Sequence, residues 1–592
     1  MRTHLLGPAR AASLLAAATI LAACVGSGGA PSGADGGGGD ASVDATTRDV
    51  SAGDGAAADV RSIDAAAVDE ASADEASADG ASADGASASD AAAAVGVPVL
   101  QFHNHASRDG VFVDPLLTAS AAKKMHLDRT FTATIDGNVY AQPLYVVDGP
   151  GGQPAFIVAT ENNNVYALDE NGATIWARRI GAAAARAEVC GNIRPLGITG
   201  TPVVDPTRRA LYVDAALPGV GTTSMAEHEI HALSLEDGSE LAGGWPVKAS
   251  TVSGVMGADA GTMKFLPNPQ NQRGALLILG STLYVPYGGH SGDCTDSSGA
   301  YYRGWVIGVP LDRPGGATGF VTQASQSGIW ATGGLATDGT SIFGTTGNAG
   351  GGQSCPNPPP VSPPPGWAQQ EAILRFRPGP VWSGQTTDYW APADWPCLDN
   401  ADLDVGGSSP VVVDLPSGSP RHLVVALGKD GNMYVADRTN LGGVGAPVAS
   451  LNILSRTIKA APAAYATPSG TYVVAYGIGG AGVGCPAGQT GNLVAVKITP
   501  GTPPTLSTAW CADELGEGAP IFTTSDGTHD NLVWAVGAEA SNELRAWDAD
   551  TGALVYAGTD VLAGSRHFST VIAVKGRIFS AADSALNAFT SQ

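Results

Sequence analysis

The sequence is short of positive charge. It has 31 lysines and arginines against 55 aspartates and glutamates, which gives a net charge of −24 and a pI near 4.6. A nucleic-acid partner needs a basic face to meet its phosphates, so we expect no nucleic-acid binding. Several common catalytic motifs are also missing, because the chain has no GxSxG elbow, no P-loop and no HExxH.

The chain begins with an apolar run, Ala11–Leu21, that is too short to span a bilayer. It follows Arg2 and Arg10, so residues 1–23 are predicted to be a signal peptide. The run ends in Leu-Ala-Ala-Cys, which resembles a bacterial lipobox and implies lipidation at Cys24. The alternative is an ordinary signal peptide with an incidental cysteine. The residue after Cys24 is Val25 and not Asp, which by resemblance to bacterial sorting rules favours the outer membrane of the cell envelope. The folded part would then face the periplasm or the surface.

Residues 24–96 have little to bury. They are rich in Ala, Gly, Ser and Asp, and between Val25 and Ala94 there are fourteen acidic residues against two arginines. An acid recurs about every five residues, which is the period of neither a helix nor a strand. We therefore predict a disordered, self-repelling tether that holds the folded part away from a membrane surface.

The folded part, 97–592, opens with a blade-sized unit. Its four runs rich in β-branched and aromatic residues are bounded by turn residues; they are Gln142–Val147, Phe156–Thr160, Val165–Leu168 and Ala173–Arg178. Such a meander cannot bury both faces alone, so copies must stack. The rest of the chain supplies them, giving seven full units and a last one that lacks a strand. Thr130–Ile135 can donate the missing strand, which predicts an all-β, eight-bladed β-propeller closed by its N-terminal strand. Seven blades and an array of β-sandwiches are the alternatives.

Two segments, ALDENGATIW at 167–176 and RAWDADTGALVY at 545–556, resemble the tryptophan-docking repeat of the pyrroloquinoline-quinone (PQQ) propeller superfamily. Longer segments such as GNVYAQPLYV at 137–146 and GKDGNMYVADR at 428–438 are similar to a secreted PQQ-like repeat family of mostly unassigned activity. The resemblance implies that Trp176 and Trp547 dock neighbouring blades. It implies a fold and leaves the function open, because the repeat records blade packing.

Six cysteines remain besides Cys24, and an even number in an exported chain predicts three disulfides. Proximity along the chain suggests Cys355–Cys397, Cys485–Cys511 and Cys190–Cys294, although fifteen pairings are possible. There is no CxxCH for a c-type haem, and the adjacent cysteine pair of PQQ alcohol dehydrogenases is absent.

The first strand of each blade lines the channel of a propeller, so polar residues at or before these strands are candidates for a site at one mouth. They are Gln142, Arg194, Thr201, Ser408, Lys459, Glu517, Arg566 and His567. Glu517 and His567 could form an acid–base pair if their blades bring them together. The structural alternative is that all of these side chains satisfy buried backbone and one another around a water-filled channel.

Asp399, Asp402 and Asp404 form the densest acidic loop of the folded part, and closely spaced carboxylates in a loop that ends in glycine suit Ca²⁺. His103 and His105 are two residues apart and could bind a metal from one strand, but no third ligand is evident and we expect a surface arm there.

The leading hypothesis is a monomeric, lipid-anchored propeller that acts as a binding or scaffold module and not as an enzyme. The order of lipobox, tether and propeller resembles scaffold lipoproteins of the BamB type, and the partner would be an envelope protein or a saccharide. Ca²⁺ is the cofactor that the acidic loop suggests. The alternatives are a PQQ- and Ca²⁺-dependent oxidoreductase of alcohols or sugars, and a carbohydrate-active hydrolase or lyase.

Overall fold

The computed structural model describes residues 96–186, 190–291, 295, 299–350, 354–360 and 364–592. The predicted signal peptide, Cys24, the tether and Cys294 lie outside these residues. In the described part, strands dominate and the helices are short; the α-helices are α2 (Ala119–Ala122) and α3 (Trp395–Ala401). The all-β prediction is confirmed. None of the helices described is long and apolar enough to cross a membrane.

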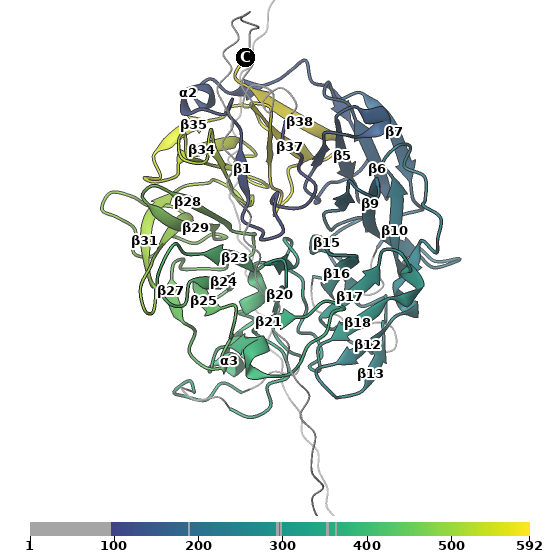
Figure 1. Cartoon of the computed structure of the whole chain (residues 1–592), viewed down its shortest axis with the longest axis vertical. Coiled ribbons are helices and arrows are strands. Elements are labelled where there is room, and N and C mark those ends of the chain that lie inside the picture. Colours follow the sequence, from purple (N-terminus) through teal and green to yellow (C-terminus); the bar gives the residue numbers. More distant parts are fainter. Residues whose placement is uncertain (1–95, 187–189, 292–294, 296–298, 351–353, 361–363) are drawn as a thin grey trace, which may run out of the picture. The chain divides into compact units, whose positions relative to one another are not determined.

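The strands of the described residues form eight sheets that follow one another around a ring (Figure 1). The first sheet comprises β4 (Leu144–Val146), β5 (Ala155–Ala159), β6 (Asn164–Leu168) and β7 (Thr174–Arg179), and the second comprises β8 (Val203–Asp205), β9 (Ala210–Pro218), β10 (Met225–Ser234) and β11 (Val247–Lys248). The third sheet comprises β12 (Ser253–Met256), β13 (Thr262–Lys264), β14 (Gln270–Asn271), β15 (Leu277–Leu279), β16 (Thr282–Gly289), β17 (Trp305–Pro310) and β18 (Thr318–Val321). The fourth sheet comprises β19 (Ala336–Thr337), β20 (Ile342–Thr346), β21 (Ala372–Phe376), β22 (Tyr389–Ala391) and β26 (Gly443–Val444).

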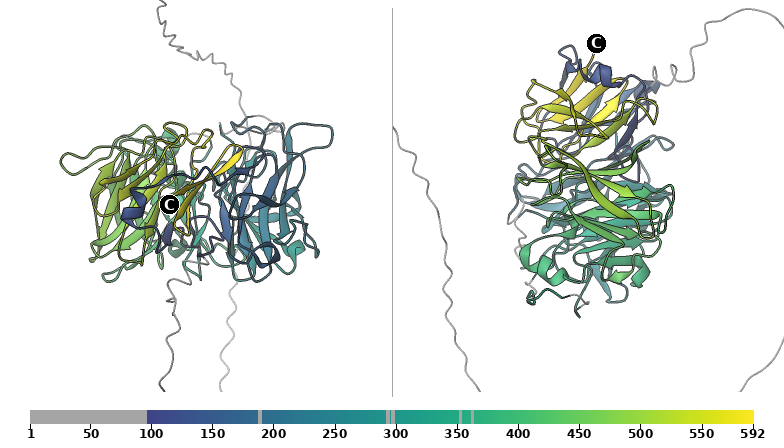
Figure 2. Two further views of the ribbon diagram at one scale, coloured as in Figure 1. Left: turned by 90° about the horizontal axis from the view of Figure 1, so that it is seen from above. Right: turned by 90° about the vertical axis from the view of Figure 1, so that its left-hand side faces the viewer.

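The other four sheets continue around the ring, and two of them include strands from the N-terminal part of the chain. The fifth sheet comprises β23 (Val411–Asp414), β24 (His422–Leu427), β25 (Asn432–Asp437) and β27 (Ala449–Asn452), and the sixth comprises β28 (Ala463–Thr467), β29 (Gly470–Tyr476), β30 (Leu493–Thr499) and β31 (Thr505–Ala512). The seventh sheet comprises β1 (Val111–Val113), β32 (Ile521–Thr524), β33 (Leu532–Val536), β34 (Leu544–Asp548) and β35 (Leu554–Ala557). The eighth sheet comprises β2 (His126–Leu127), β3 (Ala133–Thr134), β36 (Ile572–Val574), β37 (Arg577–Ala582) and β38 (Ala585–Thr590). Figure 2 shows this part of the chain from two further sides.

The turns follow from their residues. In the turn between β6 and β7, Asp169 Oδ1 accepts hydrogen bonds from the backbone N–H groups of Asn171 and Ala173, at 2.9 and 2.8 Å. Gly172 takes a φ of 89°, which a side chain would disfavour. Asp548 makes the same kind of turn and accepts from Thr551 N at 2.9 Å. These aspartates therefore act as turn formers.

Neighbouring sheets pack face to face through shared apolar cores. Trp176 lies against the next sheet, where its Nε1 donates to Leu235 O at 3.0 Å. A Cβ at Gly238 would lie 2.8 Å from the Trp176 ring, so the indole needs a glycine in that turn. Trp510 repeats the arrangement and donates to Ala549 O at 2.8 Å. Trp547 is buried in the core that joins the β28–β31 sheet to the β32–β34 strands.

The first and last sheets share a core as well. It includes Tyr145 and Phe156 from the first sheet and Phe579 from the last, and the rings of Phe156 and Phe579 lie 4.3 Å apart. Within the last sheet, β2 and β3 both pair antiparallel with β38, so residues near 126 and 134 lie beside the C-terminal strand. The expected donor segment Thr130–Ile135 overlaps β3.

An N-terminal arm, residues 99–114, runs along the inner strands of the ring, and Figure 1 shows its strand β1 on the inner side of the ring. Arm carbonyls accept hydrogen bonds from the inner strands of six sheets; the donors are Tyr145 N, Val204 N, Thr337 N, Val412 N, Ala464 N and Phe522 N. β1 then pairs in parallel with β32, and Asp114 Oδ2 accepts from Gly576 N at 2.7 Å. The expected surface arm at His103 and His105 is wrong for His103, which is fully buried.

Arg108 is the centre of the arm. It is 1% exposed, and its guanidinium donates to Leu335 O at 2.8 Å, Leu276 O at 2.9 Å and Phe102 O at 3.0 Å. Burial lowers the pKa of Arg108 to about 9. Leu276 and Leu335 come directly before β15 and β19, the inner strands of the third and fourth sheets. One side chain therefore joins the arm to these two sheets, and together with the backbone contacts the arm reaches all eight.

Two of the predicted disulfides, Cys355–Cys397 and Cys485–Cys511, are present. The third predicted pair includes Cys294, which lies outside the described residues.

Replacing Arg108 with Met is expected to lower the free energy of unfolding by about 3 kcal/mol or more, because three buried carbonyls lose their donor. Urea unfolding of the exported, oxidised protein measures it. The control is Arg129→Met, whose side chain is 78% exposed and pairs with Asp560 at the surface. A loss at Arg108 no larger than the loss at Arg129 would contradict this role.

Candidate functional site

A pocket of about 440 Å³ lies at one mouth of the ring. It is lined by residues just before inner strands, such as Lys459 before β28, Glu517 before β32 and His567 before β36. Arm residue Phe102 lies in its wall. A second hollow, of about 480 Å³, is lined by the opposite ends of the inner strands and by Ser107 and Asp109 of the arm. The arm thus separates the two mouths.

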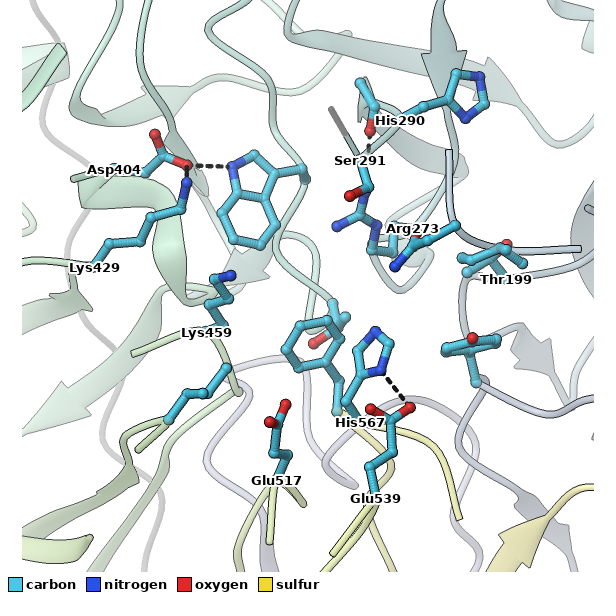
Figure 3. Close-up of a pocket in the computed structure, with 18 of the residues that line it drawn as sticks. Thr199, Arg273, His290, Ser291, Asp404, Lys429, Lys459, Glu517, Glu539 and His567 are labelled. Atoms are coloured by element: carbon cyan, nitrogen blue, oxygen red, sulfur yellow. Dashed lines mark hydrogen bonds and ion pairs between the residues drawn. The ribbon is translucent and has the colours of Figure 1, made fainter. Parts of the chain in front are cut away.

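One half of the pocket is cationic. Arg273 Cζ and Lys429 Nζ lie 5.5 and 5.4 Å from the centre of the Trp330 ring. Lys459 points into the same space (Figure 3), and within the described residues its ammonium has no hydrogen-bond or ion-pair partner. Burial lowers the pKa of Lys459, and the charge of Lys429 lowers it further. Two cations therefore lie over one indole, and a third faces the same pocket.

Asp404 holds this half in place. Its side chain is 2% exposed, and Oδ2 accepts from Lys429 Nζ at 2.8 Å and from Trp330 Nε1 at 3.1 Å. Oδ1 accepts from Asn348 N at 2.9 Å. Burial by itself would lower the pKa of Lys429, but Asp404 and Asp402 raise it above its ordinary value. The indole and one ammonium are thus fixed before any ligand arrives.

The other half carries acid–base groups. His567 Nδ1 lies 2.6 Å from Glu539 Oε1. A neutral imidazole in this contact keeps its proton on Nδ1 and leaves the Nε2 lone pair free. Glu517 lies beside it in Figure 3, and burial together with the charge of Glu539 raises the pKa of Glu517 above its ordinary value, against the opposing charges of His567 and Lys459.

Backbone hydrogen bonds join the loops of this acid–base half. Phe568 N donates to Glu517 O at 2.9 Å, and Glu539 N donates to Ser565 O at 3.2 Å. Glu517 N in turn donates to Ala538 O at 3.0 Å. The three side chains therefore come from one connected backbone frame, although they belong to two sheets.

Fully buried glutamates anchor three of the pocket loops. Glu161 accepts from Gly197 N at 2.7 Å, Glu371 accepts from Val405 N at 2.6 Å, and Glu514 accepts from Gly518 N at 2.7 Å. These acceptors hold the loops that carry Thr199, Asp404 and Glu517. Burial raises the pKa of all three, and that of Glu161 reaches about 7.

The structure brings several of the predicted site residues together and separates others. Thr201, Asp402, Asp404, Lys459, Glu517 and His567 line the pocket. Gln142 instead holds the arm, because its Oε1 accepts from His103 N at 2.9 Å and its Nε2 donates to Gln101 O at 3.2 Å. Ser408 is buried and accepts from Leu427 N, Arg194 is exposed, and Arg566 pairs with Asp583.

The contacts of the aspartate loop do not support the Ca²⁺ prediction. Asp402 and Asp404 both pair with Lys429, while Asp399 is buried in α3 and accepts from Ala349 N at 2.9 Å. Within the described ranges, no group of three His, Cys, Asp or Glu side chains is arranged to hold a metal ion. The two histidines of the arm also diverge, since His105 bonds to Asp109 at the surface.

Sequence reasoning missed Tyr140, Arg273, Trp330, Lys429 and Glu539, all of which line the pocket. Lys429 and Glu539 follow second strands, Arg273 lies between β14 and β15, and Trp330 lies in the connection between the third and fourth sheets. A search restricted to the approaches of first strands could not reach them. The useful signal was a charged or aromatic residue in any Gly-rich connection on the same side of the ring.

The ring of sheets with a polar pocket at one mouth is that of a β-propeller. No protein-family model and no curated protein matches the sequence. Solved structures with a similar fold include the quinohemoprotein alcohol dehydrogenase ADHIIG from Pseudomonas putida HK5, with 14% identity, coverage of 83% of this chain and 80% of that one, and a TM-score of 0.54.

Two further solved structures have a similar fold. The quinohemoprotein alcohol dehydrogenase from Comamonas testosteroni has 13% identity, the same coverages of 83% and 80%, and a TM-score of 0.52. A europium-containing methanol dehydrogenase has 13% identity, coverages of 82% and 89%, and a TM-score of 0.53. The β-propeller fold expected from the repeat motifs is confirmed, and at these identities the likeness shows the fold alone.

Glu161→Gln is expected to remove a pH dependence of stability. The folded pKa of about 7 lies above the ordinary value of 4.5, so the stability that Glu161 contributes is complete below about pH 4.5 and is lost as the pH rises through 7. Glutamine still offers an oxygen to Gly197 N and carries no charge. The variant should therefore lose about 2.5 kcal/mol less than the wild type between pH 5 and pH 8 in urea unfolding.

The exposed Asp513→Asn serves as the control, and it should follow the wild type at both pH values. Equal slopes for Glu161→Gln and the wild type would contradict a neutral, buried Glu161.

Proposed function

We propose that this chain is a lipid-anchored, extracytoplasmic, eight-bladed propeller, closed by its N-terminal strand, that binds a small anionic ligand in the mouth pocket. The observation that carries the proposal is that Arg273 and Lys429 lie over the Trp330 ring and that Lys459 lines the same pocket. In a chain with a net charge of −24, the half of the pocket around Trp330 holds these three cations against two aspartates, Asp402 and Asp404, which leaves a small local excess of positive charge. Low-dielectric walls strengthen the attraction of such a site for an anion.

Lys459 is the group that a ligand would engage directly. Lys429 is already neutralised by Asp402 and Asp404, and Arg273 Nη2 already donates to Gly289 O at 3.0 Å. The ammonium of Lys459 is half-buried and faces the pocket without a partner in the described residues. Burial disfavours the uncompensated charge of this ammonium, and a carboxylate bound there would balance that charge.

The rest of the lining suits a hydroxylated ligand. Trp330 and Tyr140 offer flat apolar faces, and Thr199, Thr201 and Asn348 offer hydroxyl and amide groups. An acidic saccharide combines these requirements, and it accords with a partner met in the cell envelope. The membrane attachment is proposed from the lipobox at Cys24 and from the acidic tether.

We expect the protein to bind an oligosaccharide of galacturonate at least tenfold more tightly than the matched oligosaccharide of galactose, because only the former carries carboxylates. Lys459→Met should weaken the acidic ligand at least fivefold and leave the neutral one unchanged. Isothermal titration calorimetry measures both. Lys497→Met is the matched control, since Lys497 lies outside the pocket and donates to Ser469 O. Equal affinities for the two sugars would contradict the proposal.

A second candidate is a quinone-dependent oxidoreductase, favoured by the fold that the chain shares with quinohemoprotein alcohol dehydrogenases. PQQ is planar and carries carboxylates, so the three cations and the indole of Trp330 fit it. Arg273, Lys429 and Lys459 would hold its carboxylates, and PQQ would supply the hydride-accepting carbonyl. The Ca²⁺ of such a site is not matched, because Asp402 and Asp404 are both engaged by Lys429.

PQQ is tested directly by titration with and without Ca²⁺, followed by desalting and measurement of the retained quinone absorbance and of the melting temperature. From the donor set we expect any retention to be independent of Ca²⁺ and to be lost in Lys459→Met. Retention at one quinone per chain that requires Ca²⁺ would favour the oxidoreductase over the binding module.

A further inference from the structure

The cationic half and the acid–base half face each other across the pocket. In Figure 3, Lys429, Lys459 and Arg273 lie on one side, and Glu517, Glu539 and His567 lie on the other. A ligand whose carboxylate rests on the cations would therefore present its adjacent carbon to the acid–base groups. Binding an anion needs only the first half, so the second half calls for a separate explanation.

We propose that the pocket is the active site of a lyase that cleaves 4-linked uronate polysaccharides by β-elimination, with His567 as the base and Glu517 as the acid. The inference rests on the proposed function, because it needs a uronate carboxylate bound to the cations. It adds chemistry to that binding and assigns roles to residues on the opposite wall.

The first requirement is acidification of the carbon that bears the carboxylate. Loss of its proton places a second negative charge on the carboxylate group, which becomes an enediolate. A uronate carboxylate held by Lys459 and Arg273 would develop that charge beside fixed cations, which stabilise such charge without reorganising. Lys429 is already positioned by Asp404, at 2.8 Å.

The second requirement is a base with a free lone pair. The contact of 2.6 Å between His567 Nδ1 and Glu539 Oε1 places the proton on Nδ1, so Nε2 is the basic nitrogen. Within the described residues Nε2 has no hydrogen-bond partner, and His567 lines the pocket. Glu539 is a positioning residue, since it acts by holding the imidazole.

The third requirement is an acid for the leaving oxygen. Burial and the charge of Glu539 raise the pKa of Glu517, and a protonated carboxyl can donate. The hydrogen bond from Phe568 N to Glu517 O fixes Glu517 next to the loop of His567. Base and acid therefore lie on adjacent loops, as removal of a proton and protonation of a leaving group on neighbouring carbons demand.

The step balances without an oxidant or any co-reactant. His567 Nε2 takes the proton from C5 of the uronate, and the C–H electron pair becomes the C4–C5 double bond. The bond from C4 to the glycosidic oxygen breaks, and that oxygen takes the proton of Glu517. One proton has moved to His567 and one has left Glu517, and exchange with water restores both.

The experiment uses the full, processed chain with polygalacturonate, polymannuronate and polyglucuronate, and follows the ultraviolet absorbance of the conjugated double bond. At least one polymer should give a rising absorbance, and its carboxyl-reduced form should give none. His567→Gln and Glu517→Gln should each lower kcat at least about 100-fold while binding of the polymer is retained. His529→Gln, at an exposed histidine, should have no effect.

Added imidazole should restore part of the activity of His567→Ala, which a purely structural role of His567 would not allow. Retained polymer binding in the inactive variants shows that they are folded. Lys459-dependent binding of the polymers without any rise in absorbance would overturn the lyase and leave the binding proposal standing. Absence of binding by all three polymers would overturn both.

Discussion

The hydrogen bonds of the arm to the inner strands are the constraint on which the rest of the structure depends. Inner strands leave backbone groups facing the middle of the ring, and buried groups of this kind are costly without partners. The arm supplies partners in turn, and Arg108 adds a fully buried cation that satisfies carbonyls of two sheets. Because the arm also separates the two mouths and contributes Phe102 to the pocket wall, the pocket depends on it.

The pocket likewise depends on the hydrogen bonds and the ion pair that buried carboxylates make. Asp404 neutralises Lys429 and orients Trp330, and Glu161, Glu371 and Glu514 accept backbone hydrogen bonds from loops that carry lining residues. Side chains held by such a second layer are organised before the ligand binds. The segregation of cations from acid–base groups then gives the two walls different chemistry, which is the basis of both proposals.

Much of the ring could be predicted from the chain because its determinants are local. Turns such as Asp169–Gly172 combine an aspartate that bonds two backbone N–H groups with a glycine at positive φ, and apolar runs of β-branched residues lie between them. The site was predicted in part. Lys459, Glu517 and His567 were found because they precede first strands, but the partner of His567 is Glu539, which follows a second strand.

By itself, the sequence determined the strand-and-turn repeat, the docking of Trp176 and two of the disulfides, since each depends on residues close together in the chain or on a repeated pattern. Only the tertiary structure decided the course of residues 99–114, the burial of Arg108 and the meeting of Arg273, Trp330 and Lys429. The physical reason is that those contacts join different sheets. No local periodicity records which distant carbonyl a guanidinium will meet or which loops will face each other across the ring.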